Sequence, residues 1–386
     1  MIETPPLVDQ HCHGVLRTEL GLAGFEAQLI RSAGPPAAGT TFFDTQTGFA
    51  VRRWCPPLLG LEPHCPPAHY LARRRELGAA ESGRRLLRGS GVGVFLVDTG
   101  DVGAPGHDGH PGHPGHHGDG GDVCGPGELA LAGRARAHEV VRLEMLAEQA
   151  ADTSGTVAAF LANLAGAVHH AAAHAVAFSF GAAMADGTGY AQALLRAAEP
   201  PGPGEVRGAA DRWIAGRARG GAVHDPVLLR HLLWSAVSSG LPIQLHTGTA
   251  PPEALTGFVR ATAGLGAYVV LLGGYPHHRH AARLAAAYPH VHADLGPVLA
   301  RTGARAGAVL AELLELAPFG KLLYSSGARR LPELHATGAL VFREALGRVL
   351  GGWVTDGAWS WRDAHRVAGM IAAGNARRVY RLDERD

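Results

Sequence analysis

The sequence predicts an α/β fold of the (β/α)8 TIM-barrel type. Short runs rich in apolar and β-branched residues recur along the chain, and longer stretches with helical periodicity separate them. We count eight such runs, the number of strands that closes this kind of barrel. A doubly wound open sheet is the alternative, and the lack of a GxGxxG turn between a strand and a helix disfavours it. Strands are expected at residues 7–13, 92–99, 139–144, 175–180, 242–247, 268–274, 291–296 and 321–327.

The helical patterns fill most of the spaces between these runs. Residues 1–386 are expected to form one barrel domain with two additions. A helical insertion at 14–90 follows the first strand, and its apolar and Arg-rich faces would suit either a lid or a contact in a homo-oligomer. A low-complexity loop rich in His, Gly and Pro at 101–127 follows the second strand. Barrel helices are expected at 156–173, 227–239, 277–287, 304–316, 331–350 and 361–378.

Composition excludes several classes of protein. Of the 386 residues, 46% are hydrophobic and 18% charged, which is enough for a sizeable core. The net charge of +1 leaves no electrostatic footprint for nucleic acid or an anionic membrane. The first residues lack the basic and apolar regions of a signal peptide, and we find no apolar stretch long enough for a membrane span. The four cysteines form no CxxC pair, which favours a reduced, cytoplasmic setting.

The most informative motif lies near the N-terminus, where residues 8–14 read VDQHCHG. His11 and His13 are two apart on a strand, so their imidazoles project to the same side, within reach of one metal ion. His246 at the end of the fifth strand, on the same face as Gln244, could supply a third ligand. Three neutral imidazoles would hold one Zn²⁺ and leave a position open for water. The alternative is that the three are core histidines with a purely structural role, and we favour the metal site.

Other polar residues stand at the ends of expected strands, where a barrel carries its active site. Arg142 and Glu144 are expected to share a face of the third strand, as a structural ion pair or as part of a substrate site. Asp294 at the end of the seventh strand either orients a ligand histidine or caps a loop. For Asp98 we favour a simple cap of the next helix.

The loop at 101–127 is unusual in its histidine content. Its imidazoles and carboxylates would bind Zn²⁺, Ni²⁺ or Cu²⁺ loosely, so the loop could gather metal or cover the barrel mouth. The competing interpretation, which we favour, is a tolerated surface insertion without a role. The residues concerned are His107, His110, His113, His116, His117, Asp108, Asp119 and Asp122.

Taken together, the motifs resemble the amidohydrolase superfamily. The resemblance is to its amidohydrolase 2 type group, barrels that occur alone or fused to glutamine-synthetase-like domains. It implies a (β/α)8 barrel and a metal-activated water that hydrolyses C–N or related bonds, with some members acting as decarboxylases. It rests on the segments at 8–14, 52–63, 86–100, 142–144, 275–296 and 315–334.

The resemblance also implies a ligand set, which this chain matches in part. His11, His13 and His246 match the family's histidines on strands one and five. The strand-six histidine position is Gly273, and the strand-eight aspartate position is Gly327. The lysine that some members carry on strand four corresponds to Ser179. Glycine can neither bind a metal nor accept a proton, so a standard two-metal hydrolase is not expected.

We therefore expect a divergent metal-dependent hydrolase that acts on an amide-like bond of a small-molecule substrate. The expected cofactor is one divalent ion, Zn²⁺, per chain. The alternative is a non-catalytic barrel that binds a metabolite or metal or serves as a partner protein. A histidine cluster at 277–280 is a candidate replacement ligand or base, or else a solvent-facing helix start. The expected roles are metal binding for His11, His13 and His246, proton transfer for Glu144 or Asp294, and substrate binding for Arg142, Gln244 and His277.

Overall fold

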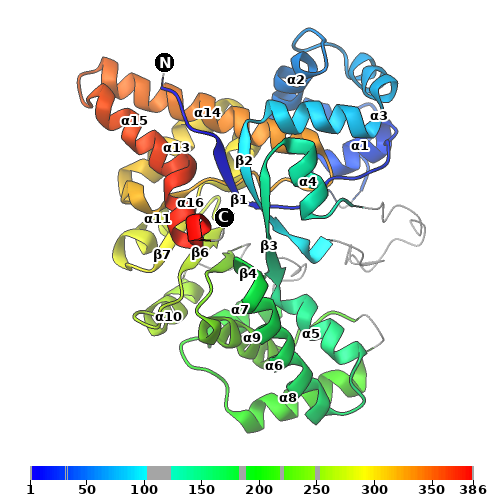
Figure 1. Ribbon diagram of the computed structural model, residues 1–386, viewed down its shortest axis with the longest axis vertical. Coiled ribbons are helices and arrows are strands. Elements are labelled where there is room, and N and C mark those ends of the chain that lie inside the picture. Colours follow the sequence, from blue (N-terminus) through cyan, green and yellow to red (C-terminus); the bar gives the residue numbers. More distant parts are fainter. Residues whose placement is uncertain are drawn as a thin grey trace. The chain divides into compact units, whose positions relative to one another are not determined.

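Eight parallel strands, arranged in sequence order, form the central sheet of the protein (Figure 1). The computed structural model describes residues 2–30, 32, 34–101, 123–181, 188–217, 221–247 and 253–384. Strand order distinguishes this sheet from the doubly wound alternative, so the predicted (β/α)8 fold class is confirmed. The strands are β1 (Leu7–Cys12), β2 (Val92–Asp98), β3 (Arg136–Arg142), β4 (Ala177–Phe180), β5 (Ile243–His246), β6 (Val269–Leu272), β7 (Val291–Asp294) and β8 (Leu322–Leu323).

The first strand also pairs with the segment that follows the last one. The Gln10 amide donates to the Tyr324 carbonyl at 3.1 Å, and the His13 amide donates to the Ala328 carbonyl at 2.8 Å. These bonds join the two ends of the sheet, as closure of a barrel requires. The expected eighth strand at 321–327 is thus regular only at its start, and its remainder continues along β1 as irregular chain.

Helices follow the strands at or near the predicted positions. Several begin with the caps that the sequence provides. Thr156 accepts a bond from the Ala159 amide at the start of α6, and Asp225 caps α9 just before Pro226. The helices are α1 (Leu22–Leu29), α2 (Gln46–Leu58), α3 (Pro67–Gly89), α4 (Pro126–Gly133), α5 (Leu143–Asp152), α6 (Val157–His174), α7 (Thr188–Leu195), α8 (Pro203–Gly216), α9 (Pro226–Ser239), α10 (Glu253–Ala261), α11 (His278–Ala287), α12 (Gly296–Thr302), α13 (Ala306–Leu316), α14 (Pro332–Thr355), α15 (Trp361–Gly369) and α16 (Asn375–Tyr380).

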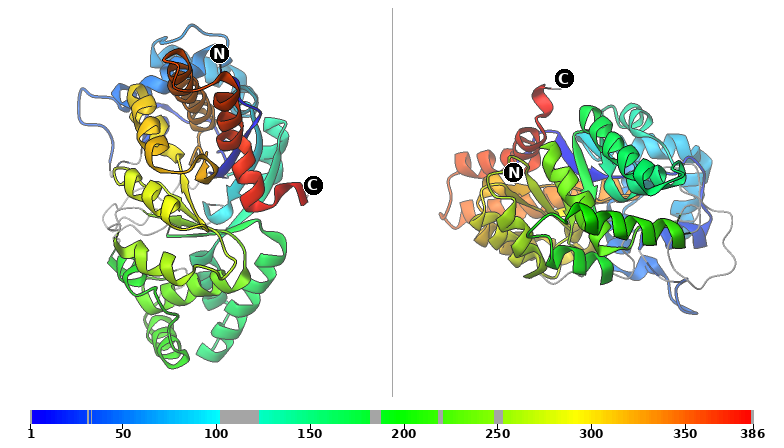
Figure 2. Two further views of the ribbon diagram at one scale, coloured as in Figure 1. Left: turned by 90° about the vertical axis from the view of Figure 1, so that its left-hand side faces the viewer. Right: turned by 90° about the horizontal axis from the view of Figure 1, so that it is seen from below.

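The chain divides into two compact units. The first unit comprises Met1–His138, Leu295–Glu315 and Leu322–Arg378, and so contains β1, β2, β8 and α14. The second unit comprises Glu139–Asp294, Leu316–Lys321 and Val379–Asp386. Within the second unit, helices α5, α6, α8 and α9 pack against one another (Figure 2).

One element differs from its prediction in a way that affects a candidate site residue. The third strand was expected at 139–144, but β3 ends at Arg142 and α5 begins at the next residue. Glu144 therefore lies in the first turn of a helix and does not share a strand face with Arg142, so that expectation was wrong. A carboxylate in the first turn is favourable beside the helix N-terminus, and its oxygen accepts a bond from the Gly181 amide at 2.5 Å.

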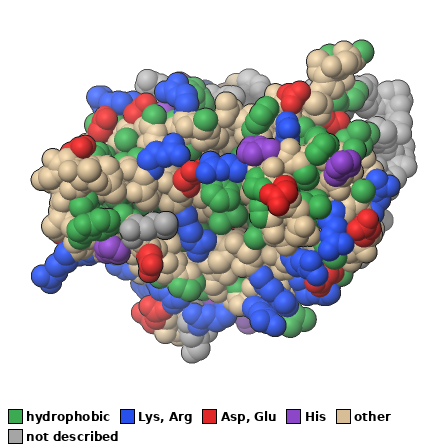
Figure 3. Space-filling view, turned by 90° about the horizontal axis from the view of Figure 1, so that it is seen from above, with side chains coloured by type: hydrophobic (Ala, Val, Ile, Leu, Met, Phe, Trp, Pro, Cys, Tyr) green, Lys and Arg blue, Asp and Glu red, His purple; other side chains and the backbone are tan. Residues whose placement is uncertain are grey.

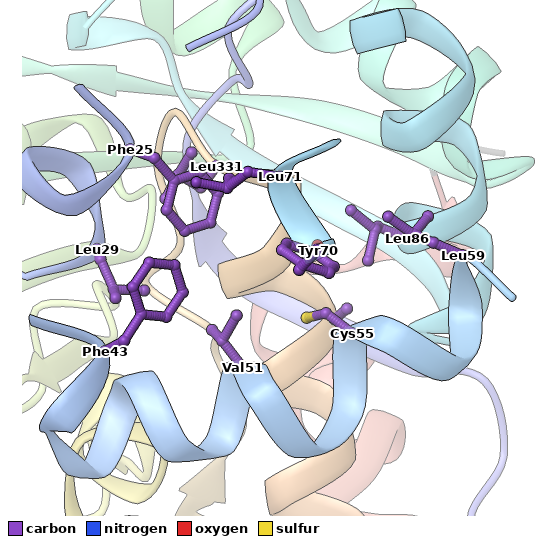
Figure 4. Close-up of a cluster of buried hydrophobic side chains, with 11 residues drawn as sticks. Phe25, Leu29, Phe43, Val51, Cys55, Leu59, Tyr70, Leu71, Leu86 and Leu331 are labelled. Atoms are coloured by element: carbon purple, nitrogen blue, oxygen red, sulfur yellow. The ribbon is translucent and has the colours of Figure 1, made fainter. Parts of the chain in front are cut away.

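The insertion at 14–90 has a hydrophobic core of its own within the first unit (Figure 4). The rings of Phe25 and Phe43 stack with centroids 5.5 Å apart. Leu331, just before α14, joins the same cluster, so the insertion is packed onto a barrel helix. Burial of each large side chain contributes about 1.5–3 kcal/mol to stability. The buried members are Phe25, Leu29, Phe43, Val51, Cys55, Leu59, Tyr70, Leu71, Leu86, Leu331 and Ala336.

A buried polar network borders this cluster. Arg74 on α3 donates to Glu333 of α14 at 2.6 Å and to Glu19 at 3.0 Å. The Tyr70 hydroxyl donates to the same Glu333 carboxylate at 2.8 Å. Burial alone would lower the pKa of Arg74, but the two carboxylates outweigh burial and raise this pKa. The guanidinium therefore stays charged inside the protein.

One face of the protein carries charged side chains of both signs. On the face drawn in Figure 3, acidic and basic side chains are interspersed, in line with the net charge of +1. Of the helices that the structure describes, none combines the length and the apolar character that a bilayer span requires.

We predict that Arg74→Met destabilises the protein far more than Arg53→Met. The first change leaves the buried Glu333 carboxylate without its cation, which costs about 3–5 kcal/mol. Arg53 also pairs with a glutamate of α14, Glu344, at 2.7 Å, but its side chain is 45% exposed. Its loss should cost about 1 kcal/mol or less. Urea unfolding midpoints would measure both changes, and equal midpoints would contradict the prediction.

Candidate metal centre

The predicted HxH pair lies at the end of β1, in the interior of the first unit. His11 and His13 are each only 4% exposed. Their ring centroids lie 5.1 Å apart with the rings nearly perpendicular, at 86°. The pairing of β1 with β2 shifts register between Asp9 and Cys12, and an irregularity of this kind re-aims the neighbouring side chains.

A carboxylate on the neighbouring strand completes a group of three metal-ligating side chains. Asp98 at the end of β2 is fully buried, and its ligand oxygen lies within 4.8 Å of ligand nitrogens of both His11 and His13. Nδ1 of His13 lies 3.2 Å from the backbone oxygen of Asp98. A proton on Nδ1 can bond that carbonyl, which leaves Nε2 as the atom available to a metal.

Asp98 also has the capping role that the sequence predicted. Its Oδ1 accepts a bond from the Gly100 amide at 2.8 Å, in the short helical turn Thr99–Asp101. The cap fixes the carboxylate at the strand end. The sequence thus gave no reason to prefer a metal role, although the position at a strand end was the available signal.

A second group of donor atoms lies next to the first. Ligand atoms of Asp9, Cys12 and His335 also lie within 4.8 Å of one another, and all three residues are fully buried. Asp9, however, already accepts bonds from the Ser326 amide at 2.7 Å and from the Ser326 hydroxyl at 2.6 Å. Burial, then the Asp9 carboxylate, raises the pKa of the Cys12 thiol well above its usual value. The Cys12 thiol donates to the Leu96 carbonyl at 3.6 Å, so Asp9 and Cys12 both already have partners and we assign this group to the packing of β1.

His335 is the histidine that sequence reasoning missed. It lies in α14, and its Nδ1 is 3.9 Å from Oδ2 of Asp9. Burial is the main cause that lowers the pKa of His335 to about 3, and the nearby His13 lowers it further. The imidazole is therefore neutral, and its contact with Asp9 is not an ion pair.

Gly327, where the resemblance to the amidohydrolase superfamily implies an aspartate, has no space for a side chain. Gly327 has φ +56°, and its amide donates to the His11 carbonyl at 3.0 Å. A Cβ atom there would stand 2.9 Å from Cγ of Pro297. Gly273, at the strand-six position, has φ +68°, but among the described atoms none lies within 4 Å of a Cβ built there. The first position has no room for a side chain, whereas the second has.

Some of the predicted site residues lie in the second unit. The Tyr190 hydroxyl donates to the carbonyl of His246, and burial, then Glu144, raises the pKa of Tyr190. Gln244 donates to the Tyr380 hydroxyl at 3.0 Å.

The remaining predicted residues also belong to the second unit. Arg142 and Asp294 are buried at the carboxyl ends of β3 and β7. His277 is exposed at the N-cap of α11, while the next residue, His278, is buried and stacks on Tyr275 with ring centroids 5.4 Å apart. The roles expected for His246, Glu144, Gln244, Arg142, Asp294 and His277 stay predictions.

The histidine-rich loop is only partly described. Residues 102–122 lie outside the described part of the chain, and with them all five histidines of the expected metal-gathering loop. The expectation for this segment stays a prediction.

Comparisons with solved structures define the class of fold. The chain aligns with a chain from Lactobacillus casei ATCC 334, assigned as a metal-dependent hydrolase, with a TM-score of 0.78 and 20% identity, over 99% of this chain and 97% of that one. A uronate isomerase of Thermotoga maritima aligns with a TM-score of 0.58 and 13% identity, over 97% and 94%. The chain thus shares the (β/α)8-barrel fold with these proteins, and the fold that the resemblance implied is confirmed.

A comparison with curated sequences gives a match over only part of the chain. A stretch of 153 residues is 32% identical to Protein fluG of Emericella nidulans. The match takes 37% of this chain but only 18% of the fungal protein, so the chain corresponds to a small part of that protein's length. No protein-family model matches the chain.

We predict that Gly327→Ala destabilises the protein more than Gly273→Ala. Both positions have positive φ, so each substitution costs about 1–2 kcal/mol in backbone strain. Only the first also drives a methyl group into Pro297, which adds about 1–3 kcal/mol. Thermal unfolding midpoints would compare the two variants. Equal decreases in the midpoint would show that Pro297 moves aside at no cost, and would contradict the prediction.

We also predict that His335 makes the protein sensitive to acid. Its pKa is about 3 in the folded protein and about 6.5 in an unfolded chain. As pH falls below about 6.5, His335 becomes protonated in the unfolded state but stays neutral in the folded state. The free energy of unfolding therefore falls by up to ~1.4 kcal/mol per pH unit. His335→Phe keeps the ring and should lose less stability between pH 7.5 and 5. Urea unfolding in EDTA measures the difference, and parallel pH profiles would contradict it.

Proposed function

We propose that this protein is a metal-dependent hydrolase that acts on a C–N, amide-like bond of a small molecule. The single observation that supports this proposal most is the convergence of His11, His13 and Asp98 in the interior of the first unit. In this proposal the three side chains hold one divalent ion, Zn²⁺. Asp98 takes a ligand position that we did not predict, and His246 as a further ligand stays a prediction.

The donor set suits such an ion. Two imidazoles and one carboxylate are a ligand set of catalytic zinc sites, and they leave a coordination position open. A divalent ion bound there supplies Lewis-acid polarisation and lowers the pKa of water. The protein itself orients the three donor side chains and keeps solvent away from them. The Asp98 carbonyl at 3.2 Å fixes the tautomer of His13, and burial keeps bulk water from all three donors.

Proton transfer requires a group outside β8. Gly327 carries no side chain, and Pro297 leaves no room for one. A carboxylate elsewhere must therefore accept the proton that the family's strand-eight aspartate would take. Glu144 and Asp294 are our candidates for this role.

Metal content tests the proposal directly. Protein purified without a tag should contain about one equivalent of Zn²⁺ by elemental analysis. His11→Ala, His13→Ala and Asp98→Asn should each lose the ion. Asp98→Asn keeps the oxygen that caps Gly100 while it removes the charge, so its loss of metal would reflect the lost ligand. His69→Ala, an exposed histidine on α3, is the matched control and should retain the ion.

Hydrolysis of a panel of small amides by the metal-loaded protein tests the reaction. Turnover that disappears in His11→Ala and Asp98→Asn but persists in His69→Ala would support the proposal. Full metal retention in all three ligand variants would overturn it.

The second candidate function is a non-catalytic barrel that binds a metal or a metabolite. The observation that favours it is the contact between Gly327 and Pro297, which removes a side chain from the strand-eight position. Metal that depends on His11 and Asp98, together with no amide turnover by the loaded protein, would support this candidate over the hydrolase.

A further inference from the structure

The first turn of α14 faces two parts of the first unit at once. Glu333 and His335 are two residues apart on a helix, which places their side chains about 200° apart around its axis. Both are 0% exposed. Glu333 faces the insertion, whereas His335 faces β1, so one helical turn contacts both.

On the insertion side, three residues hold this turn. Tyr70 and Arg74 of α3 donate to one oxygen of Glu333 at 2.8 and 2.6 Å. The Cys55 thiol of α2 donates to the Glu333 backbone carbonyl at 3.7 Å. Side chain and backbone of Glu333 are therefore both fixed by the insertion.

On the strand side, His335 packs against β1 and β2, the strands that carry the donors. Its Nδ1 lies 3.9 Å from Oδ2 of Asp9, and its ring meets the edge of Phe95 on β2 with centroids 5.7 Å apart. A ring nitrogen of His335 also lies within 4.8 Å of the thiol of Cys12, the residue between His11 and His13. A movement of His335 would therefore reach the strand that bears His11 and His13.

We propose that His335 is a positioning residue for the metal centre, and that Tyr70, acting through Glu333, holds His335 in place. This inference rests on the proposed function, because it concerns the same three metal donors. In this proposal the insertion contributes to the metal centre indirectly. The insertion holds the first turn of α14 in place, and that turn holds the end of β1 in place. Residues behind the ligands of a metal commonly change its affinity 10- to 100-fold.

The test compares His335→Phe, Tyr70→Phe and Arg53→Met as purified full-length proteins. His335→Phe keeps a ring beside Phe95 but removes the nitrogens that face Asp9. Tyr70→Phe removes a single hydroxyl, so it should fold. Arg53→Met is the matched control, because Arg53 also links the insertion to α14 but at Glu344, well beyond the first turn. Zn²⁺ affinity is measured by competition with a chromophoric chelator, and the visible spectrum of the Co²⁺-loaded protein reports ligand geometry.

If the inference holds, the Zn²⁺ Kd rises about tenfold or more in His335→Phe and by a smaller factor in Tyr70→Phe. The Co²⁺ spectrum shifts in both, although circular dichroism shows both to be folded. Arg53→Met keeps the wild-type Kd and spectrum. Wild-type Kd and spectrum in folded His335→Phe and Tyr70→Phe would overturn the inference while the proposed function stands. A wild-type protein that binds no Zn²⁺ would overturn both, and this result is distinguishable because it needs no variant.

Discussion

Two hydrogen bonds between Asp9 and Ser326 hold β1, the strand that carries His11 and His13, in its place in the sheet. Both carboxylate oxygens of Asp9 accept bonds from this one serine, at 2.7 and 2.6 Å. A buried carboxylate is costly unless its oxygens are satisfied, so the segment after β8 must stay in register with β1. This register also determines where His11 on β1 and His13 just after it lie. The first unit thus fixes its candidate metal ligands by an interaction that involves none of them.

Two kinds of contact join the insertion to the barrel. One contributes mainly to stability, and the other determines the position of α14. The apolar cluster around Phe25 and Phe43 supplies stability, but such a cluster tolerates small shifts. The bonds of Tyr70 and Arg74 to Glu333 have short distances and fixed donors, and therefore hold α14 at one place. Apolar packing holds the insertion on the barrel, while the polar network determines the position of α3 relative to α14.

Sequence reasoning succeeded where periodicity or local spacing carries the information. Eight strands and the HxH pair follow from apolar runs and from the two-residue repeat of a strand. The end of β3 was misplaced because an alternating pattern cannot show where a strand passes into the first turn of a helix, as happens at Glu144. His335 was missed because its partner on β1 is remote in sequence, and a single histidine in a helix carries no local signal of such a contact. Asp98 was recognised only as a cap, since a cap and a ligand have the same appearance in the sequence.

The contact between Gly327 and Pro297 constrains the order in which this barrel could change. An aspartate cannot be introduced at Gly327 alone, because the new Cβ would meet the proline ring at 2.9 Å. Replacement of Pro297 would have to come first. Only then would an aspartate at 327, a residue that tolerates positive φ better than most, have space to exist. Any exchange of Gly327 for a residue with a side chain must therefore be accompanied by a change at Pro297, a residue outside the candidate metal centre.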